Sequence, residues 1–359
     1  MEREVLLRVQ NLQQYFKMGR RELKAVDNVS FDIYKGEVFG LVGESGCGKT
    51  TTGRSIIRLY DITGGSVYYK GERICAGIRS YKDAISKARK DFASKKISKE
   101  ERDRIIAENR EEIKKANADH QKWSRSKGQN QLTNEIQMIF QDPIASLDPR
   151  MTVRDIIAEG LVIRGIKDKE YIDQQVYKIL ETVGLVQEHA SRYPHEFSGG
   201  QRQRIGIARA VIMNPELIIA DEPISALDVS IQAQVINLLH ELSDKMGLTI
   251  LFIAHDLAVV KYFSDRIAVM YFGKIVELAT SDELFAHPFH PYTRALLSAI
   301  PLPDPVSEKN RTRIEYKPVL DHDYSKEGPT MREVCPGHFV LCNTEEFNKY
   351  RQELEQSEK

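Results

Sequence analysis

The sequence has no long apolar segment, few cysteines and no net charge. Its 359 residues include four cysteines and one tryptophan, and 52 basic side chains balance 52 acidic ones. A membrane-spanning helix needs about 20 apolar residues in a row, whereas the longest apolar stretch, 248–260, is interrupted by His255 and Asp256. So few scattered cysteines exclude a disulfide-stabilised scaffold. We therefore expect a cytosolic chain with reduced thiols, without a signal peptide, whose membrane role would come through a partner.

The zero net charge conceals a local excess of basic residues. Residues 79–127 contain 16 Lys and Arg against nine Asp and Glu. Ser80 and Ser98 each begin a Ser-x-x-acid pattern typical of helix N-termini, so we predict a charged helical hairpin. One interpretation is docking to anionic lipids or an acidic partner, with Trp123 and the lysines of 122–127 as contact points. The other is a solvated insertion whose charges pair along its own helices.

Residues 43–50, GESGCGKT, fit the phosphate-loop pattern G-x-x-x-x-G-K-[ST]. An apolar segment at 38–42 predicts a strand that enters the loop, and a helix follows Lys49. Glycine lets backbone N–H groups wrap a phosphate chain, and Lys49 is expected to reach the β- and γ-phosphates. A fortuitous glycine-rich turn is the alternative. The residues expected to contact ATP in this loop are Gly43, Ser45, Gly46, Cys47, Gly48, Lys49, Thr50 and Thr51.

Two acidic residues follow the apolar segment 217–220. Asp221 is suited to holding Mg²⁺, and Glu222 is suited to polarising the attacking water as a general base. Acidic residues often follow strands without a catalytic role. The phosphate loop upstream favours the catalytic interpretation of this pair. Together with the apolar segment 249–254, these runs predict buried parallel strands separated by helices. The predicted fold class is α/β.

The segment Phe197-Ser-Gly-Gly-Gln201 resembles the signature motif of ATP-binding-cassette (ABC) ATPases, with Phe where the family usually has Leu. Gln141 matches the family's Q-loop, 225–228 its D-loop, and His255 its switch histidine. The resemblance implies an ABC-type nucleotide-binding domain: a RecA-like core, an antiparallel β subdomain and an α-helical subdomain. To these it adds a helical-hairpin insertion and a C-terminal extension.

The resemblance also implies roles for individual residues. Phe16, or its neighbour Tyr15, would stack on adenine. The catalytic residues would be Glu222, His255 and Gln141. The Mg²⁺ ligands would be Thr50, Gln141 and Asp221. The residues that contact the ATP of a partner subunit would be Ser198, Gly199, Gly200 and Gln201, with Asp228 in the D-loop. One subunit would therefore contain two half-sites, and ATP binding would close a dimer.

A narrower resemblance follows the ATPase motifs. Residues 287–301, 146–152 and 222–234 are similar to oligopeptide and dipeptide importer ATPases, and the signature segment resembles the F-type subunit of the oligopeptide permease. This implies a heterodimer with a homologous D-type ATPase subunit, two membrane permease subunits and, indirectly, an extracytoplasmic peptide-binding protein. The chain would then lie at the cytoplasmic face of the membrane. Dipeptide, nickel or other small-solute import stays open.

A non-transport ABC ATPase acting on ribosomes or nucleic acid is the alternative from another class. It usually has two cassettes or long coiled-coil arms, and this chain shows one cassette and a short insertion, so we expect no nucleic-acid partner. The predicted parts are 1–77, the N-terminal ATPase part; 78–133, the insertion; 134–280, the remaining ATPase motifs; and 281–359, the extension.

The C-terminal part departs from the family pattern. Many relatives carry four cysteines suited to an iron–sulfur cluster, whereas only Cys335 and Cys342 occur here, so we predict no cluster. After Gly273 the chain is rich in proline, and we expect irregular structure that ends in a polar helix at 344–356.

Overall fold

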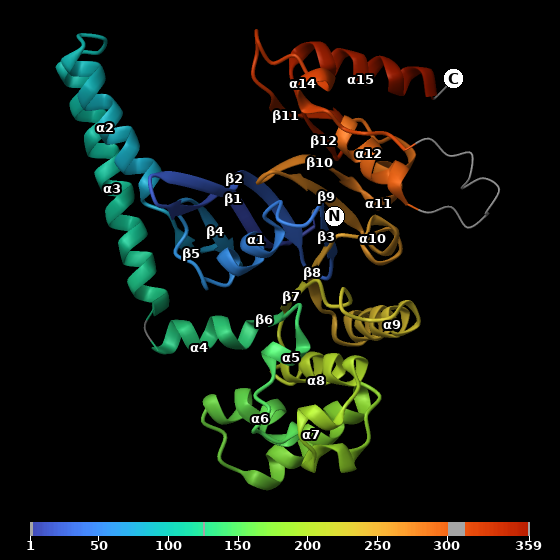
Figure 1. The fold of residues 1–359 in the computed structure, drawn as a ribbon. Coiled ribbons are helices and arrows are strands. Elements are labelled where there is room, and N and C mark those ends of the chain that lie inside the picture. Colours follow the sequence, from blue (N-terminus) through green and yellow to red (C-terminus); the bar gives the residue numbers. More distant parts are fainter. Residues whose placement is uncertain (1–2, 125, 301–312, 358–359) are drawn as a thin grey trace. The chain divides into compact units, whose positions relative to one another are not determined.

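The computed structural model describes residues 3–124, 126–300 and 313–357, and its contacts divide the chain into two units (Figure 1). The first unit includes residues up to 35, 50–136 and 272–274, and the second includes 36–49, 137–271 and the described residues from 275 onward.

A mostly parallel sheet forms the centre of the second unit. Its strand order is β11-β12-β10-β9-β3-β8-β7-β6, and β3 runs parallel to both β8 and β9. The bounds are β3 Val38–Val42, β6 Ile136–Ile139, β7 Leu217–Asp221, β8 Thr249–Ala254, β9 Arg266–Tyr271, β10 Lys274–Thr280, β11 Thr330–Cys335 and β12 His338–Cys342. All residues of β3, β7 and β8 are buried, as expected for continuous apolar runs between layers of helices. The predicted α/β fold class and these three strands are confirmed.

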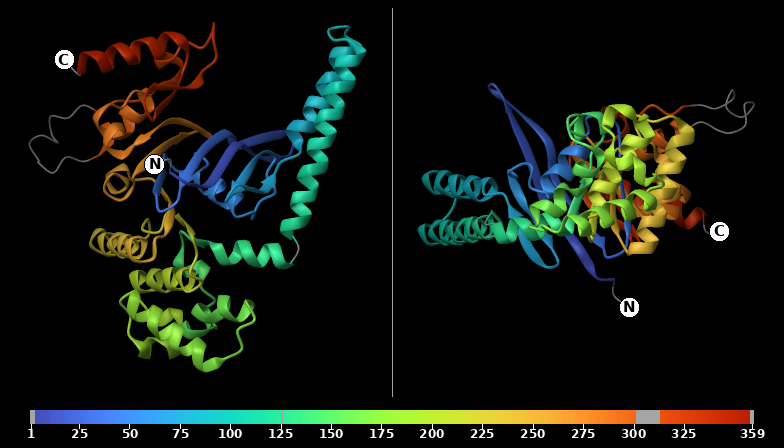
Figure 2. Two further views of the ribbon diagram at one scale, coloured as in Figure 1. Left: turned by 180° about the vertical axis from the view of Figure 1, so that it is seen from behind. Right: turned by 90° about the horizontal axis from the view of Figure 1, so that it is seen from below.

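Helices pack around this sheet and form a separate layer where α5 to α8 contact one another (Figure 2). The sequence of 152–155 fits a capping box, and Thr152 begins α6, because its Oγ1 accepts a hydrogen bond from the Asp155 amide at 3.2 Å. The helical sequence from there to Val183 forms two helices, because the chain turns at Gly165. The helices of this unit are α5 Pro143–Ser146, α6 Val153–Ile163, α7 Lys169–Thr182, η1 Gln187–Ser191, η2 Pro194–Glu196, α8 Gly199–Val211, α9 Val229–Met246, α10 Leu257–Phe263, α11 Ser281–Ala286, α12 Pro291–Ala299, α14 Pro318–Asp321 and α15 Thr344–Ser357.

The first unit contains an antiparallel sheet of strand order β2-β1-β4-β5, followed by the predicted insertion. Residues 29–33 alternate between apolar and polar, which predicts a strand; they are part of β2, and their apolar side chains are buried. The elements are β1 Val5–Met18, β2 Arg21–Tyr34, α1 Lys49–Ile56, β4 Gly64–Tyr69, β5 Glu72–Ala76, α2 Arg79–Ala93, α3 Lys99–Ser124 and α4 Ser126–Glu135.

The insertion is a helical hairpin, α2 and α3, with a third helix added (Figures 1 and 2). Ser98 begins α3 as predicted, because its Oγ accepts a hydrogen bond from the Glu101 amide at 3.1 Å. The prediction that Ser80 begins α2 is wrong, because Ile78 is the N-cap and no side chain caps this helix. The apolar sequence of 135–141 predicts a strand, and the structure has a shorter one, β6, because α4 occupies the chain as far as Glu135.

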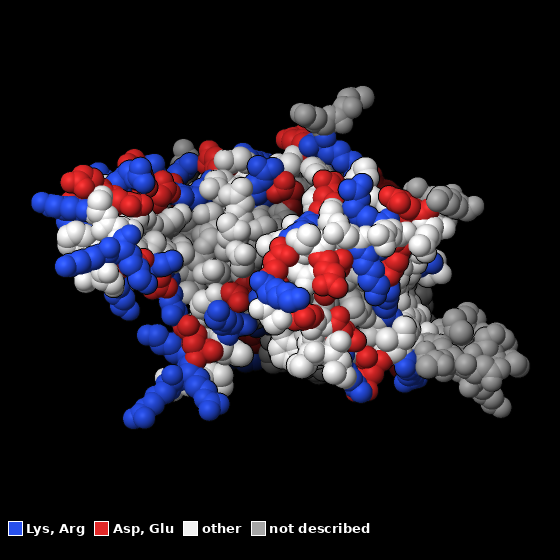
Figure 3. Space-filling model, turned by 90° about the horizontal axis from the view of Figure 1, so that it is seen from above, with Lys and Arg blue, Asp and Glu red and all other residues white. Residues whose placement is uncertain are grey.

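Helix α3 is anchored to the first unit's sheet. The Arg73 guanidinium on β5 contacts Asp119 at 2.6 Å and Glu112 at 3.4 Å. Trp123 is only 3% exposed, so the expectation that it is a contact point for partners is wrong. Lys122 remains exposed and lies over the Trp123 ring. Figure 3 shows acidic side chains among the basic ones over the hairpin, at its left, so the excess positive charge is partly offset locally.

The irregular structure expected after Gly273 is wrong. Strand β10 and helices α11 and α12 follow, and β11 and β12 form a hairpin closed by Pro336 and Gly337. The Gly337 φ of +80° is the left-handed conformation that a Pro-Gly turn requires at its second central residue. The predicted C-terminal helix is confirmed as α15. Within the described ranges, no helix combines the length and apolar character needed to cross a membrane.

Candidate active site

The phosphate loop connects β3 to α1. Gly43 has φ +152°, and a Cβ atom there would lie 2.1 Å from the Met270 carbonyl oxygen, so only glycine fits. Lys49 begins α1, and its buried ammonium donates to the Gly43 carbonyl at 2.7 Å and to the Glu44 carbonyl at 2.9 Å. The carbonyl groups of the loop therefore hold the Lys49 ammonium, which is expected to bind phosphate.

Glu222 lies at the centre of the predicted catalytic residues. Gln141 donates to Glu222 Oε2 at 3.0 Å, and His255 Nδ1 lies 3.5 Å from the same oxygen. Lys49 Nζ lies 3.8 Å from Oε1. Residues predicted from four separate motifs therefore meet around one carboxylate.

The backbone places this carboxylate in an uncommon conformation. Glu222 follows β7 and has φ +45°, which non-glycine residues rarely adopt. Its amide donates to the Ile253 carbonyl of β8 at 2.9 Å, and this bond fixes the turn. Strained backbone of this kind is concentrated at functional sites. The tight turn after β7 directs Glu222 toward the phosphate loop and the end of β8.

Asp221 immediately precedes Glu222 and is fully buried at the end of β7. Thr50 and Thr51 belong to the first turn of α1. The predicted donors to Mg²⁺ are a carboxylate, a hydroxyl and the Gln141 amide oxygen, and Mg²⁺ prefers oxygen donors. The chemistry of this donor set fits the ion.

The predicted signature residues form the start of α8. Ser198 Oγ accepts from the Gln201 amide at 3.4 Å, and Gln201 Oε1 accepts from the Ser198 amide at 3.1 Å, which is a capping box. Phe197 is buried and packs edge-on against His189 at 5.1 Å, so the departure from Leu fills the core. Ser198 and Gly199 are exposed. This helix start therefore presents its first turn to solvent.

The remaining residues predicted to contact nucleotide or the partner subunit lie outside the phosphate loop and the signature segment. Asp228 is exposed at the N-terminus of α9. Tyr15 and Phe16 lie on β1 in the first unit. The Tyr15 hydroxyl donates to Asp27 Oδ1 at 2.5 Å, and burial raises its pKa. Phe16 makes an edge contact with Tyr60 at 5.4 Å and has no polar group to satisfy, which makes it the better of the two for stacking.

Tyr292 contacts the phosphate loop, although no motif assigns a role to it. It lies on α12, is 2% exposed, and its hydroxyl accepts a hydrogen bond from the Glu44 amide at 3.1 Å. The only signal was its place inside the family-like segment 287–301. Cys47 within the loop is buried, and burial raises the pKa of its thiol, so it behaves as a small packed residue.

Comparison with known proteins agrees with this geometry. The family model for ABC transporters matches residues 26–132 and 95–225, and the model for the oligopeptide/dipeptide transporter C-terminal region matches 276–338. The oligopeptide transport ATP-binding protein OppF of Bacillus subtilis is 55% identical over 97% of this chain and 99% of its own length. The dipeptide transport ATP-binding protein DppF of Lactococcus lactis is 48% identical over 96% of both chains.

Solved structures show the same fold. A dimeric ATP-binding cassette in a post-hydrolysis state, bound to ADP and Pi, superimposes with a TM-score of 0.57 at 24% identity, covering 77% of this chain and 99% of that one. A component of the ABC transporter complex cbiONQ from Clostridium perfringens gives 0.59 at 22% identity, covering 79% and 91%. The predicted ABC-type fold is confirmed, and the chain belongs to the ABC transporter family, among the ATP-binding proteins of its oligopeptide and dipeptide branch.

Proposed function

We propose that this chain binds and hydrolyses ATP as one subunit of an ABC importer for oligopeptides. The observation that carries the ATPase assignment is the convergence of Lys49, Gln141 and His255 on Glu222, beside the phosphate loop. A carboxylate in that position accepts a proton from the water that attacks the γ-phosphate, while Gln141 and His255 orient the carboxylate.

Lys49 changes partners when the nucleotide binds. Its ammonium leaves the carbonyls of Gly43 and Glu44 and contacts the β- and γ-phosphates, which carry a full negative charge. Thr50, Gln141 and Asp221 would hold Mg²⁺, which would neutralise negative charge on the phosphates. Phe16 stacks on the adenine, with Tyr15 as the alternative.

The exposed start of α8 serves a second subunit. The Ser198 hydroxyl and the first amides of α8 make an anion site that faces the γ-phosphate bound by the partner, with Gly199, Gly200 and Gln201 lining it. Asp228 contacts the same interface. ATP therefore favours the closed dimer because the closed state provides both halves of each site.

The assignment to peptide import is supported by the names of the relatives and by the C-terminal region. The partners proposed are a homologous D-type ATPase subunit, two membrane permease subunits and an extracytoplasmic peptide-binding protein that this chain does not touch. The chain then lies peripherally at the cytoplasmic face of the membrane. A dipeptide importer is the second candidate, because a relative of nearly equal identity is named for dipeptide transport.

The substitution Glu222→Gln tests the ATPase assignment. We expect ATP binding to persist and hydrolysis to fall about 10²–10⁴-fold, the range for loss of a general base, with closed dimer accumulating in ATP. Glu241→Gln is the matched control, because Glu241 lies exposed on α9 in a surface pair with Lys245. Turnover by Glu222→Gln close to that of the control would remove Glu222 from the proposed role.

The substrate and the partners need a separate measurement. The chain is co-expressed with candidate permease and ATPase subunits, and the complex is reconstituted in liposomes with its binding protein. Stimulation of ATP hydrolysis by oligopeptides supports the proposal. If dipeptides or nickel stimulate hydrolysis and oligopeptides do not, the proposed substrate is wrong and the ATPase assignment still stands.

A further inference from the structure

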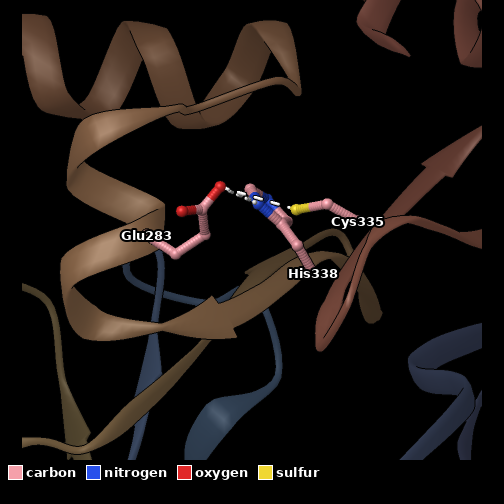
Figure 4. A group of neighbouring side chains, drawn as sticks. All are labelled: Glu283, Cys335 and His338. Atoms are coloured by element: carbon pink, nitrogen blue, oxygen red, sulfur yellow. Dashed lines mark hydrogen bonds and ion pairs between the residues drawn. The ribbon is translucent and has the colours of Figure 1, made fainter. Parts of the chain in front are cut away.

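Three metal-ligating side chains meet where the C-terminal hairpin contacts α11 (Figure 4). Glu283 comes from α11, Cys335 from the end of β11 and His338 from the start of β12. One ligand atom from each lies within 4.8 Å of the other two. The turn through Pro336 and Gly337 pairs Cys335 with His338 and places both on one side of the hairpin end.

The separations match a tetrahedral zinc site. Cys335 Sγ lies 3.6 Å from Glu283 Oε1, and His338 Nδ1 lies 3.3 Å from the same oxygen. A tetrahedral Zn²⁺ with Zn–S near 2.3 Å and Zn–N or Zn–O near 2.1 Å places its ligand atoms about 3.4–3.6 Å apart. The two separations that involve Glu283 Oε1 therefore match those of a zinc site, and the remaining pair of ligand atoms lies within 4.8 Å.

A second carboxylate orients the histidine for this purpose. His338 is fully buried, and its Nε2 lies 2.8 Å from Oε1 of Glu277, which is also fully buried. Glu277 is held in place by the backbone amides of Phe289, at 2.8 Å, and His290, at 3.1 Å. A carboxylate that accepts the N–H of a ligating histidine fixes its tautomer and raises its basicity.

This arrangement leaves a lone pair that needs a cation. A neutral imidazole has one N–H, and when His338 donates it to Glu277 the lone pair on Nδ1 faces the Glu283 carboxylate. Two acceptors at 3.3 Å repel each other unless a proton or a metal ion lies between them. The nearby Cys335 thiol favours the metal, because thiolate, imidazole and carboxylate together are a donor set that zinc accepts.

We propose that Glu283, Cys335 and His338 bind one Zn²⁺ ion. His287, one helical turn after Glu283 with its Nδ1 3.1 Å from the same Oε1 atom, lies outside this group, so the fourth position is left to a water molecule. The ion joins α11 to the β11–β12 hairpin within the C-terminal extension. Binding releases the thiol proton of Cys335.

The site differs from an iron–sulfur cluster in its ligands. Cys342 pairs with Thr330 in the hairpin, five residues along β11 from Cys335, and its Sγ contacts the Val340 carbonyl at 3.6 Å. Of the two C-terminal cysteines, only Cys335 therefore belongs to the group of three candidate ligands. One thiolate with a histidine and a carboxylate suits a single ion.

Zinc content and affinity of the full chain test the proposal. The nucleotide-free protein, without a metal-binding tag, is stripped with a chelator and titrated with Zn²⁺ against a competing indicator. We expect one ion per chain. Cys335→Ser is expected to weaken binding by at least about 100-fold, because even loss of a supporting partner costs 10–100-fold. Cys342→Ala, in the same hairpin, is expected to leave the affinity unchanged.

A measurement on the unmodified chain guards against variants that fail to fold. Co²⁺ in place of Zn²⁺ is expected to show thiolate-to-cobalt charge-transfer absorption, and Zn²⁺ is expected to protect Cys335 from alkylation. Absence of both effects, or equal zinc affinity in Cys335→Ser and the parent, would overturn the site. Iron recovered together with acid-labile sulfide would also overturn it, in favour of a cluster.

Discussion

Buried His290 makes the stability of the chain depend on pH in a direction that the structure defines. Its side chain is 1% exposed, and its Nδ1 accepts a hydrogen bond from the Tyr292 amide at 3.1 Å. Burial, followed by the electrostatic effects of His322 and Arg294, lowers the pKa of His290 from 6.5 to about 3. The folded chain therefore keeps this imidazole neutral in mild acid.

The magnitude follows from the two pKa values. In the unfolded chain His290 titrates near pH 6.5, so the unfolded state binds a proton below that pH while the folded state does not. A lowered folded pKa contributes stability that is fully present above pH 6.5 and is lost progressively as the pH falls toward 3. Between pH 7 and pH 5 the loss is about 2 kcal/mol.

His290→Asn isolates this contribution, because Asn also accepts the capping hydrogen bond and does not titrate. Both proteins are unfolded with urea at pH 7 and pH 5, with a chelator present so that metal occupancy does not vary, and circular dichroism follows the transition. The parent is expected to lose about 2 kcal/mol more than the variant over this interval. Equal losses would show that His290 is not held neutral.

Two further substitutions test contacts that the structure revealed. Arg73→Ala removes the ion pair to Asp119 and is expected to destabilise the first unit by about 1–2 kcal/mol, measured by urea unfolding. Lys122→Ala, which removes a more exposed ion pair, is expected to have a much smaller effect. Equal losses of stability in the two variants would contradict the anchoring of α3. Tyr292→Phe removes the acceptor for the Glu44 amide and is expected to cost about 1 kcal/mol, or up to about fivefold in ATP affinity by calorimetry. Unchanged affinity would mean that the hydroxyl does not shape the loop.

The elements that the sequence predicted are those whose signal is local. Strands β3, β7 and β8 are buried on both faces, so their runs of apolar residues are recognisable without knowledge of their neighbours. The convergence on Glu222 could be anticipated because each contributing residue belongs to a motif. The left-handed conformation of Glu222 could not, because the hydrogen bond to Ile253 on the neighbouring strand fixes it.

Two of the failures share one cause, which is contact between distant segments. Trp123 lies on a charged helix, and its burial depends on the elements that α3 packs against, which include β5. The β11–β12 hairpin follows a proline-rich stretch that gives no periodic signal, and its register is fixed by pairing with β10 and by the Pro336-Gly337 turn. The charge and proline content of a segment can be seen in the sequence, whereas the burial of Trp123 and the pairing of β11 with β12 depend on the other segments that they contact.

The C-terminal extension is continuous with the ATP site through hydrogen bonds within the second unit. His338 bonds to Glu277, which accepts the His290 amide, and His290 accepts the Tyr292 amide. The Tyr292 hydroxyl in turn accepts the Glu44 amide of the phosphate loop. Each group along this path is buried or partly buried, so water does not readily replace a lost partner. The extension therefore supports the predicted phosphate loop through Tyr292, and the proposed zinc ion would link the hairpin and α11 to the same chain of hydrogen bonds.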